Sequence, residues 1–193
     1  TKCMNLLRKF SRDERGSGVV EFVVMFPLLC WALLATVSYF HAYRSEAVAV
    51  KATMTLADMV SRETEYITPT YLTNMRRLLQ FLSMSDTTPD FRITAFRWNE
   101  NRDMYQVRWS RERGRQRTLR TSGLNALADQ LPLLSHNERA ILIETWSDYE
   151  PKYNYNLGLN GHQFKNFIVV TPRFATQLCW NSSPDLDPAR ARC

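Results

Sequence analysis

The pattern of apolar positions divides the chain into one long apolar segment near the N-terminus and a more polar remainder. Residues 19–40 contain a single charged side chain, Glu21. As a helix, these 22 residues would rise about 33 Å, which is close to the hydrocarbon thickness of a bilayer. The segment therefore predicts one membrane-spanning helix.

The same helix is expected to continue beyond the membrane. Between residues 18 and 66 only Pro27 disfavours a helix. Because proline lacks an amide donor and crowds the preceding turn, we expect a kink there. The pattern thus predicts one helix over 17–66. Its outer part is amphipathic, with an apolar stripe made of Val50, Met54, Ala57 and either Val60 or Ser61.

A second helix is expected over residues 71–84, after the Thr68-Pro69-Thr70 punctuation. Either threonine could cap it, because a side-chain oxygen can accept from the free amides of the first turn. Its apolar stripe consists of Leu72, Met75, Leu78, Leu79 and Leu82. The two outer helices therefore form a hairpin.

From residue 91 onward the pattern changes to alternation with period two. Residues 91–98 and 104–110 alternate around a turn at 99–103, which predicts a β-hairpin. Residues 111–117 are expected to form a loop and 124–131 a short helix, and Ser135 is a candidate N-cap with Glu138 three positions on. Further strands are expected at 141–149 and 167–171.

These elements predict an α+β fold, in which a small antiparallel sheet packs on helices. Residues 1–16 form a basic leader, 17–66 the long helix with its transmembrane part at about 19–40, and 67–193 a globular head. At 193 residues, the chain has room for one membrane helix and one modest head.

The charge distribution predicts the orientation in the membrane. Five basic residues precede the apolar segment, and it is followed by Arg44 and Lys51 beside Glu46. Because cytoplasmic flanks carry the positive excess, the N-terminus is expected in the cytoplasm and the head on the opposite side. A cleaved secretory signal is the main alternative. The segment is longer than a usual signal core and no A-x-A-like site follows it, so we expect it to remain in the mature protein.

The cysteines fit this topology. Cys3 lies in the leader and Cys30 in the bilayer, so only Cys179 and Cys193 are placed to form a disulfide outside the cytoplasm. Such a bridge suits an oxidising compartment and would contribute about 3 kcal/mol by loop entropy. Two unpaired thiols near the C-terminal end remain the alternative.

The segment Arg12 to Pro27, which reads RDERGSGVVEFVVMFP, carries the strongest functional signal. A carboxylate inside an apolar helix costs at least about 2.5 kcal/mol near the bilayer centre and less near its edge. Taken alone, Glu21 would be expected to reach the cytoplasmic headgroups. However, Gly16 lies five residues before Glu21 and six before Phe22, behind a charged leader.

This spacing resembles the type IV prepilin pattern in its tight-adherence (Tad, or Flp) form. The resemblance implies cleavage between Gly16 and Ser17 by a membrane aspartic peptidase, which would make Glu21 the fifth residue and Phe22 the sixth. It also implies that the Glu21 carboxylate neutralises the new N-terminal amine of another subunit in the fibre core. The segment Ala140 to Pro151, which reads AILIETWSDYEP, resembles a TadE-type strand ending in Tyr-x-Pro.

The wider stretch, with its basic leader, Arg-Asp-Glu-Arg-Gly, Val-Glu-Phe and a downstream proline, resembles the TadE/TadF-like minor pilins, whereas the major Flp pilins are much shorter. A minor pilin of this kind takes part in assembly, priming or tip formation of a pilus used for surface adhesion. The implied partners are the membrane, the major Flp pilin, a second TadE-like minor pilin, the prepilin peptidase and an inner-membrane assembly platform. The implied location is the inner membrane with a periplasmic head, and the cell surface after processing. The alternative is an uncleaved single-pass component of the apparatus whose head binds proteins.

The net charge of +6 is local, because nine of the twenty arginines fall between residues 92 and 120. An anionic surface could be contacted by Arg111, Arg113, Arg115 and Arg117. A solvated sheet face is the favoured interpretation, and nucleic acid is not expected as a partner. Neither a catalytic motif nor a metal-ligand spacing is present among the three histidines and four cysteines. The sequence therefore predicts no enzyme, cofactor or metal site.

Overall fold

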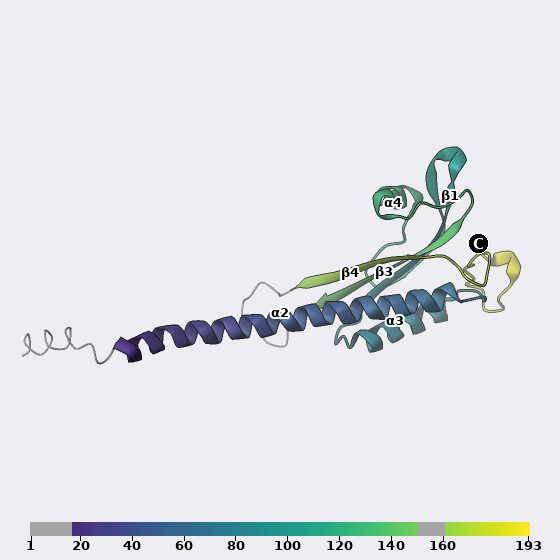
Figure 1. Cartoon of the computed structure of the whole chain (residues 1–193). Coiled ribbons are helices and arrows are strands. Elements are labelled where there is room, and N and C mark those ends of the chain that lie inside the picture. The colour runs from purple at the N-terminus through teal and green to yellow at the C-terminus, as the bar shows by residue number, and fades with distance from the viewer. Residues whose placement is uncertain (1–16, 150–160) are drawn as a thin grey trace, which may run out of the picture.

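The computed structural model describes residues 17–149 and 161–193. The long helix α2 (Ser17–Ser61) projects far beyond a head that combines α3 (Pro69–Ser83), a four-stranded sheet and the short helix α4 (Thr121–Asn125) (Figure 1). The predicted α+β class is confirmed, with a long apolar N-terminal helix followed by a small antiparallel sheet.

The sheet has the strand order β2-β1-β3-β4, and all neighbouring strands are antiparallel. Its strands are β1 (Asp90–Asn99), β2 (Met104–Arg113), β3 (Arg139–Tyr149) and β4 (His162–Val170). The predicted hairpin is therefore present as β1 and β2, joined by a 3-10 turn that ends at Asp103 with a positive φ of 48°. Strand β2 runs three residues beyond 110, because Arg111, Glu112 and Arg113 pair with β1 instead of forming the expected loop.

One face of the sheet packs against α2 and α3. The main hydrophobic core lies here, and Phe91 and Ile93 of β1 and Ile143 of β3 are fully buried in it. Leu56 and Val60 of α2 close the core from the helix side. Burial of each such side chain stabilises the fold by about 1.5–3 kcal/mol, so this core joins the outer half of α2 firmly to the head.

The opposite face carries a second core under α4 and the chain that follows it. Phe96, Tyr105 and Leu142 from the sheet meet Leu124 and Leu131 there. The expected helix over 124–131 is instead α4 plus a 3-10 turn at Ala128–Gln130. Ser135 starts a turn before β3 and caps no helix, although its amide donates to Glu138 Oε2 as the motif predicted.

Helix α2 ends at Ser61, five residues before the expected end at 66. Two interactions outside the helix explain this difference. The Ser61 carbonyl accepts from the Arg173 amide at 2.7 Å, and Ile67 is drawn into a parallel bridge with Trp180. Between them, the Glu63 carboxylate accepts from the amides of the next two residues and forms a turn.

The face of α2 that meets the head matches the expected stripe in part. Ala57, Val60 and Ser61 are buried as expected, whereas Met54 is exposed, and the other buried positions are Ala49, Ala52, Thr53 and Leu56. Small residues occupy this face because the helix lies close to the sheet. Helix α3, by contrast, follows the expected pattern. Its first turn is capped by the Thr68 hydroxyl, and its buried residues are Leu72, Met75 and Leu79.

Candidate membrane helix and functional surfaces

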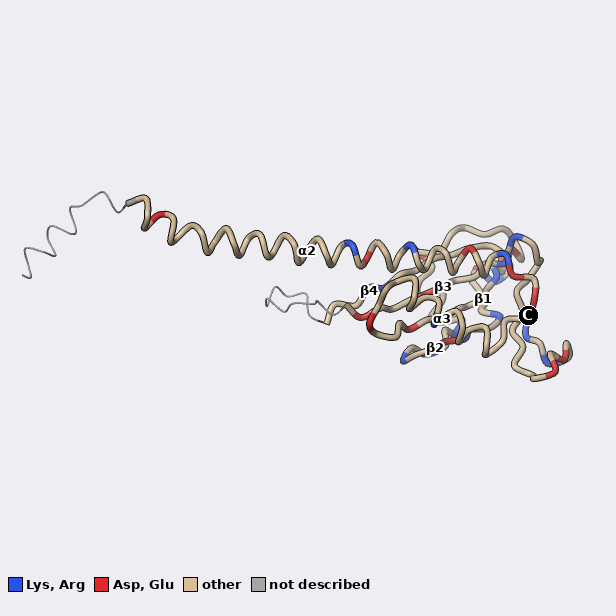
Figure 2. The backbone as a smooth tube through the Cα atoms, turned by 90° about the horizontal axis from the view of Figure 1, so that it is seen from below, with Lys and Arg blue, Asp and Glu red and all other residues tan. Residues whose placement is uncertain are grey.

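The N-terminal half of α2 is an apolar rod that no other described part of the chain covers. Most of its large side chains are more than half exposed; Val19 is 67% and Phe40 64% exposed. Ala42 is the first buried residue along the helix. Figure 2 shows the uncharged stretch between one acidic position near the start of α2 and the first basic position on its outer part. By length and composition, α2 is able to cross a membrane.

Two hydroxyl side chains in this stretch are satisfied within the helix. The Thr36 hydroxyl donates to the Ala32 carbonyl at 2.9 Å, and the Ser38 hydroxyl donates to the Leu34 carbonyl at 2.8 Å. This bonding removes the cost of bringing a free hydroxyl into hydrocarbon. Helix α2 continues without interruption through Pro27, so the proline does not end it.

The motif residues lie at the free end of this rod. Glu21 and Phe22 are exposed, and the Phe22 ring stacks on that of Phe26 with centroids 5.2 Å apart. The Glu21 carboxylate makes no hydrogen bond or ion pair within residues 17–149 and 161–193. Gly16 lies outside the described residues, as do Pro151 and the end of the Tyr-x-Pro segment, whereas Ala140 to Tyr149 lie in the central strand β3.

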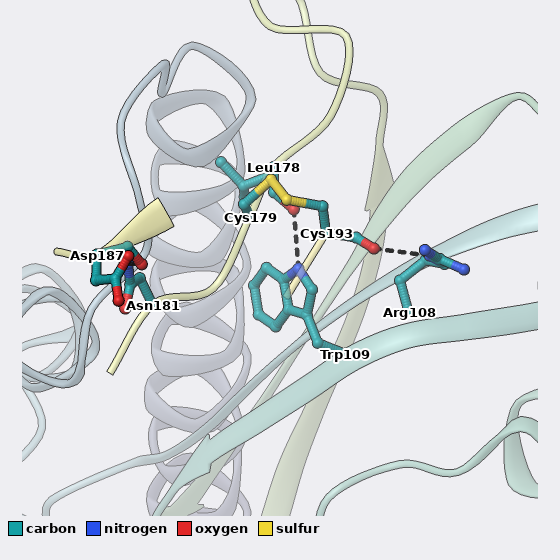
Figure 3. Close-up of a disulfide and its surroundings, with 7 residues drawn as sticks. All are labelled: Arg108, Trp109, Leu178, Cys179, Asn181, Asp187 and Cys193. Atoms are coloured by element: carbon teal, nitrogen blue, oxygen red, sulfur yellow. Dashed lines mark hydrogen bonds between the residues drawn. A yellow bond between two sulfur atoms is a disulfide. The ribbon is translucent and has the colours of Figure 1, made fainter. Parts of the chain in front are cut away.

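A disulfide closes the end of the head that lies farthest from the free end of α2. Cys179 and Cys193 are bonded, and the chain around them lies on the core between α2 and β2 (Figure 3). The Trp109 indole donates to the Leu178 carbonyl at 2.8 Å, and the Arg108 Nε donates to the Cys193 carbonyl at 2.8 Å. The C-terminal segment is thus an integral part of the fold.

The four arginines proposed for anionic contact are not one open patch. Arg111 lies over the Trp180 ring at 4.9 Å, and burial beside Arg192 lowers its pKa. Arg113 donates to Thr73 Oγ1 and the Pro69 carbonyl, so it fastens β2 to α3. Arg115 forms ion pairs with Asp90 and Asp148. Of these four arginines, only Arg117 has a guanidinium without a partner in the part of the chain that the structure describes.

The Arg115→Gln variant is expected to lose stability at neutral pH and much less in acid. Hydrogen bonds from Gln163 and Arg115 hold the pKa of Asp148 below its ordinary value. A carboxyl with a lowered folded-state pKa stabilises the fold above its unfolded-state pKa, and this contribution disappears as the pH falls through the folded value. Because the Arg115 side chain is 67% exposed, solvent screening keeps the effect small even though its partner Asp90 is buried.

Urea unfolding at pH 7 and pH 3 measures this dependence, and Arg117→Gln is the matched control. The two variants should differ at pH 7, and this difference should narrow at pH 3. An equal midpoint for both at pH 7 would show that the Arg115 pairs contribute nothing.

Sequence reasoning missed a buried ion pair on the α4 side of the sheet. Arg92 and Glu144 face each other across β1 and β3, with Arg92 Nε 2.6 Å from Glu144 Oε2 and both side chains nearly inaccessible. Arg92 also donates to the Arg117 carbonyl at 2.7 Å and lies over the Trp146 ring. The available signal was Glu144 itself, a lone carboxylate in an apolar run.

A seam of hydroxyl groups joins α2 to the sheet. Thr53 of α2 lies 2.9 Å from the Thr145 hydroxyl of β3, and Asn166 of β4 donates to Thr145 at 3.1 Å. Thr53 also bonds back to the Ala49 carbonyl. These directional bonds fix the rotation of α2 about its axis relative to the sheet.

No family model, curated protein or solved structure matches this chain. A functional proposal therefore rests on the residues and geometry described above.

Proposed function

We propose that this chain is a TadE/TadF-like minor pilin of a tight-adherence type IV pilus system. The observation that carries the proposal is the uncovered apolar half of α2, which contains Glu21 and Phe22 of the motif and ends where the head begins. A helix with this exposure needs a lipid or protein environment along its full length. A bilayer supplies it before assembly, and neighbouring pilin helices supply it in a fibre.

The spacing of the motif supports the same proposal. Cleavage after Gly16 would place a new amine on Ser17, four residues from Glu21. Four residues of helix rise about 6 Å, so a neighbouring subunit displaced along the axis by that amount brings its amine level with this carboxylate. Two charges that are each costly in an apolar core then neutralise each other.

The head serves this function as a protein-binding module. Its proposed partners are the major Flp pilin, a second TadE-like minor pilin and the inner-membrane assembly platform, and the prepilin peptidase acts on the leader. The proposed location is the inner membrane with the N-terminus in the cytoplasm, followed by the cell surface once the subunit enters a pilus. The disulfide supports an oxidising compartment for the head.

Processing is tested with the Gly16→Val variant in cells that assemble the pilus. The wild-type chain is expected to lose residues 1–16 and start at Ser17, whereas Gly16→Val should keep the leader and abolish pilus assembly. Intact-protein mass spectrometry of the membrane fraction measures this directly. Gly18→Val is the matched control, because a side chain at Gly18 meets no other atom within 4 Å.

The competing function is an uncleaved membrane component with a protein-binding head. It predicts that wild-type cells retain residues 1–16 while the head remains on the far side of the membrane. That result would contradict a processed minor pilin, but it would still agree with a membrane-spanning α2.

A further inference from the structure

A cavity lies where the head meets the end of the apolar part of α2. Strand β4 starts beside α2 at this level (Figure 1). The cavity has a volume of about 180 Å³ and lies between the two elements. Its lining residues are Tyr39, Ala42, Tyr43 and Glu46 of α2 and His162 and Phe164 of β4.

The side chains of α2 reach this cavity together because of their spacing. Tyr39, Tyr43 and Glu46 are four and three residues apart, so they lie on one face of the helix. On the sheet side Phe164 is buried, and its ring is held between those of Tyr149 and His162, with centroids 5.5 and 5.4 Å away. One wall is therefore fixed, and the other carries two tyrosines.

The chemistry of this lining selects a cation. Aromatic faces attract an ammonium group through their quadrupoles, and a nearby carboxylate adds direct charge attraction. Among the residues that the structure describes, the cavity offers three phenyl or phenol rings, the His162 imidazole and the Glu46 carboxylate, and neither a lysine nor an arginine lines it. Within the described lining, an anion would meet Glu46 with no lysine or arginine to offset its charge.

The position of the cavity along α2 indicates which molecule supplies such a cation. Tyr39 lies in the last turn of the apolar segment, and Glu46 is six residues beyond Phe40, or about 9 Å along the axis. The headgroup layer extends roughly 5–7 Å beyond the hydrocarbon on each side. Helical side chains point back toward the N-terminus, so Glu46 reaches down into this layer, where tyrosine is also enriched.

We infer that this cavity binds the ammonium group of a phospholipid headgroup of the ethanolamine or choline type. The inference rests on the membrane-spanning role of α2 in the proposed function. The bound headgroup lies between Tyr43, Glu46 and Phe164 and links the start of β4 to the bilayer surface. The lipid thereby fixes the height of the head above the membrane.

Native mass spectrometry of the full chain tests the inference. The protein is released from mixed micelles containing equal amounts of phosphatidylethanolamine and phosphatidylglycerol. The wild-type chain is expected to retain the ethanolamine lipid roughly tenfold more than the glycerol lipid, in the range of a cation–aromatic contact aided by a carboxylate. Glu46→Gln and Tyr43→Ala should each reduce this preference to about twofold or less.

Two control variants keep the result specific. Glu65→Gln removes an exposed carboxylate beyond the end of α2, and Met54→Ala removes an exposed side chain of the same helix. Both should keep the wild-type preference. Equal retention of the two lipids by the wild-type chain would overturn the inference, as would a preference that survives Glu46→Gln.

Carbonate extraction of the same membranes separates this inference from the proposed function. A chain that resists extraction but shows no lipid preference overturns the headgroup site alone. A wild-type chain that is extracted overturns the membrane-spanning helix and the headgroup site together.

Discussion

Arg92→Met is expected to lower the free energy of unfolding by about 3–5 kcal/mol, because it leaves Glu144 buried without its charge partner. The Glu144 side chain is 1% exposed, and its Oε1 accepts no hydrogen bond within the described residues. Arg92 is therefore the group that compensates this carboxylate. Removing it also releases the Arg117 carbonyl and the contact over Trp146.

Urea unfolding of the purified chain, followed by circular dichroism, measures the loss. The matched control is Arg97→Met on the same strand, whose guanidinium donates to the neutral Gln106 and Asn137 side chains. It should cost about 1 kcal/mol or less, in the range of an ordinary hydrogen bond.

The double variant Arg92→Met/Glu144→Leu distinguishes loss of charge compensation from loss of packing. If the unpaired carboxylate causes the destabilisation, the second substitution should recover most of the lost stability, since replacing both members of a buried pair by apolar groups is often neutral. A double variant as unstable as Arg92→Met would show that the arginine acts through packing alone.

Removal of the disulfide is the second large effect. Cys179→Ser/Cys193→Ser is expected to lower the free energy of unfolding by about 3 kcal/mol, because a link between residues 14 positions apart no longer restricts the unfolded chain. Wild-type protein in reducing agent should match the variant, and reducing agent should not change the variant further.

The destabilisation should begin at the disulfide-closed end of the head. Hydrogen exchange is expected to accelerate first at Trp180 and Arg192, whose amides bond to each other's carbonyls, and at Asn181, whose amide bonds to the Ile67 carbonyl. The backbone amides around Thr53 and Thr145, where α2 is bonded to the sheet, should keep their protection from exchange. Uniform acceleration across the whole head would contradict a local role for the bridge.

The elements that could be predicted are those with a strong local pattern. Three elements are determined by residues close together in the sequence, and they appear where expected. They are the apolar segment, the capped helix α3 with its leucine stripe, and the alternating β1–β2 hairpin. The disulfide between Cys179 and Cys193 is the pairing favoured by elimination, because the other two cysteines were expected in a leader and in a membrane helix, and the structure contains it.

The elements that could not be predicted depend on contacts between distant parts of the chain. Met54 belongs to the expected apolar stripe by its helical spacing from Val50 and Ala57, yet it is exposed, because the close helix–sheet contact is made by small side chains such as Ala49 and Thr53. Arg111 was placed in a loop because charge disfavours a strand, whereas Trp180, far along the chain, provides a surface for its guanidinium. The Arg92–Glu144 pair depends on strand register across 52 residues.

The same distinction applies to the candidate site. Gly16, Glu21 and Phe22 were found from local spacing alone. The cavity beside Tyr43 and Glu46 could not be found in this way, because His162 and Phe164 reach it through the position of β4 along α2. Only the folded chain shows that this position coincides with the end of the apolar segment.

Helix α2 passes from its uncovered half into the core of the head with no intervening loop. The uncovered half and the head therefore tilt together. Its 45 residues extend about 68 Å. A tilt of about 20°, which is ordinary for a membrane helix, moves its far end sideways by roughly 23 Å. Any neighbour that sets the inclination of the apolar half therefore also sets where the disulfide-closed end of the head lies.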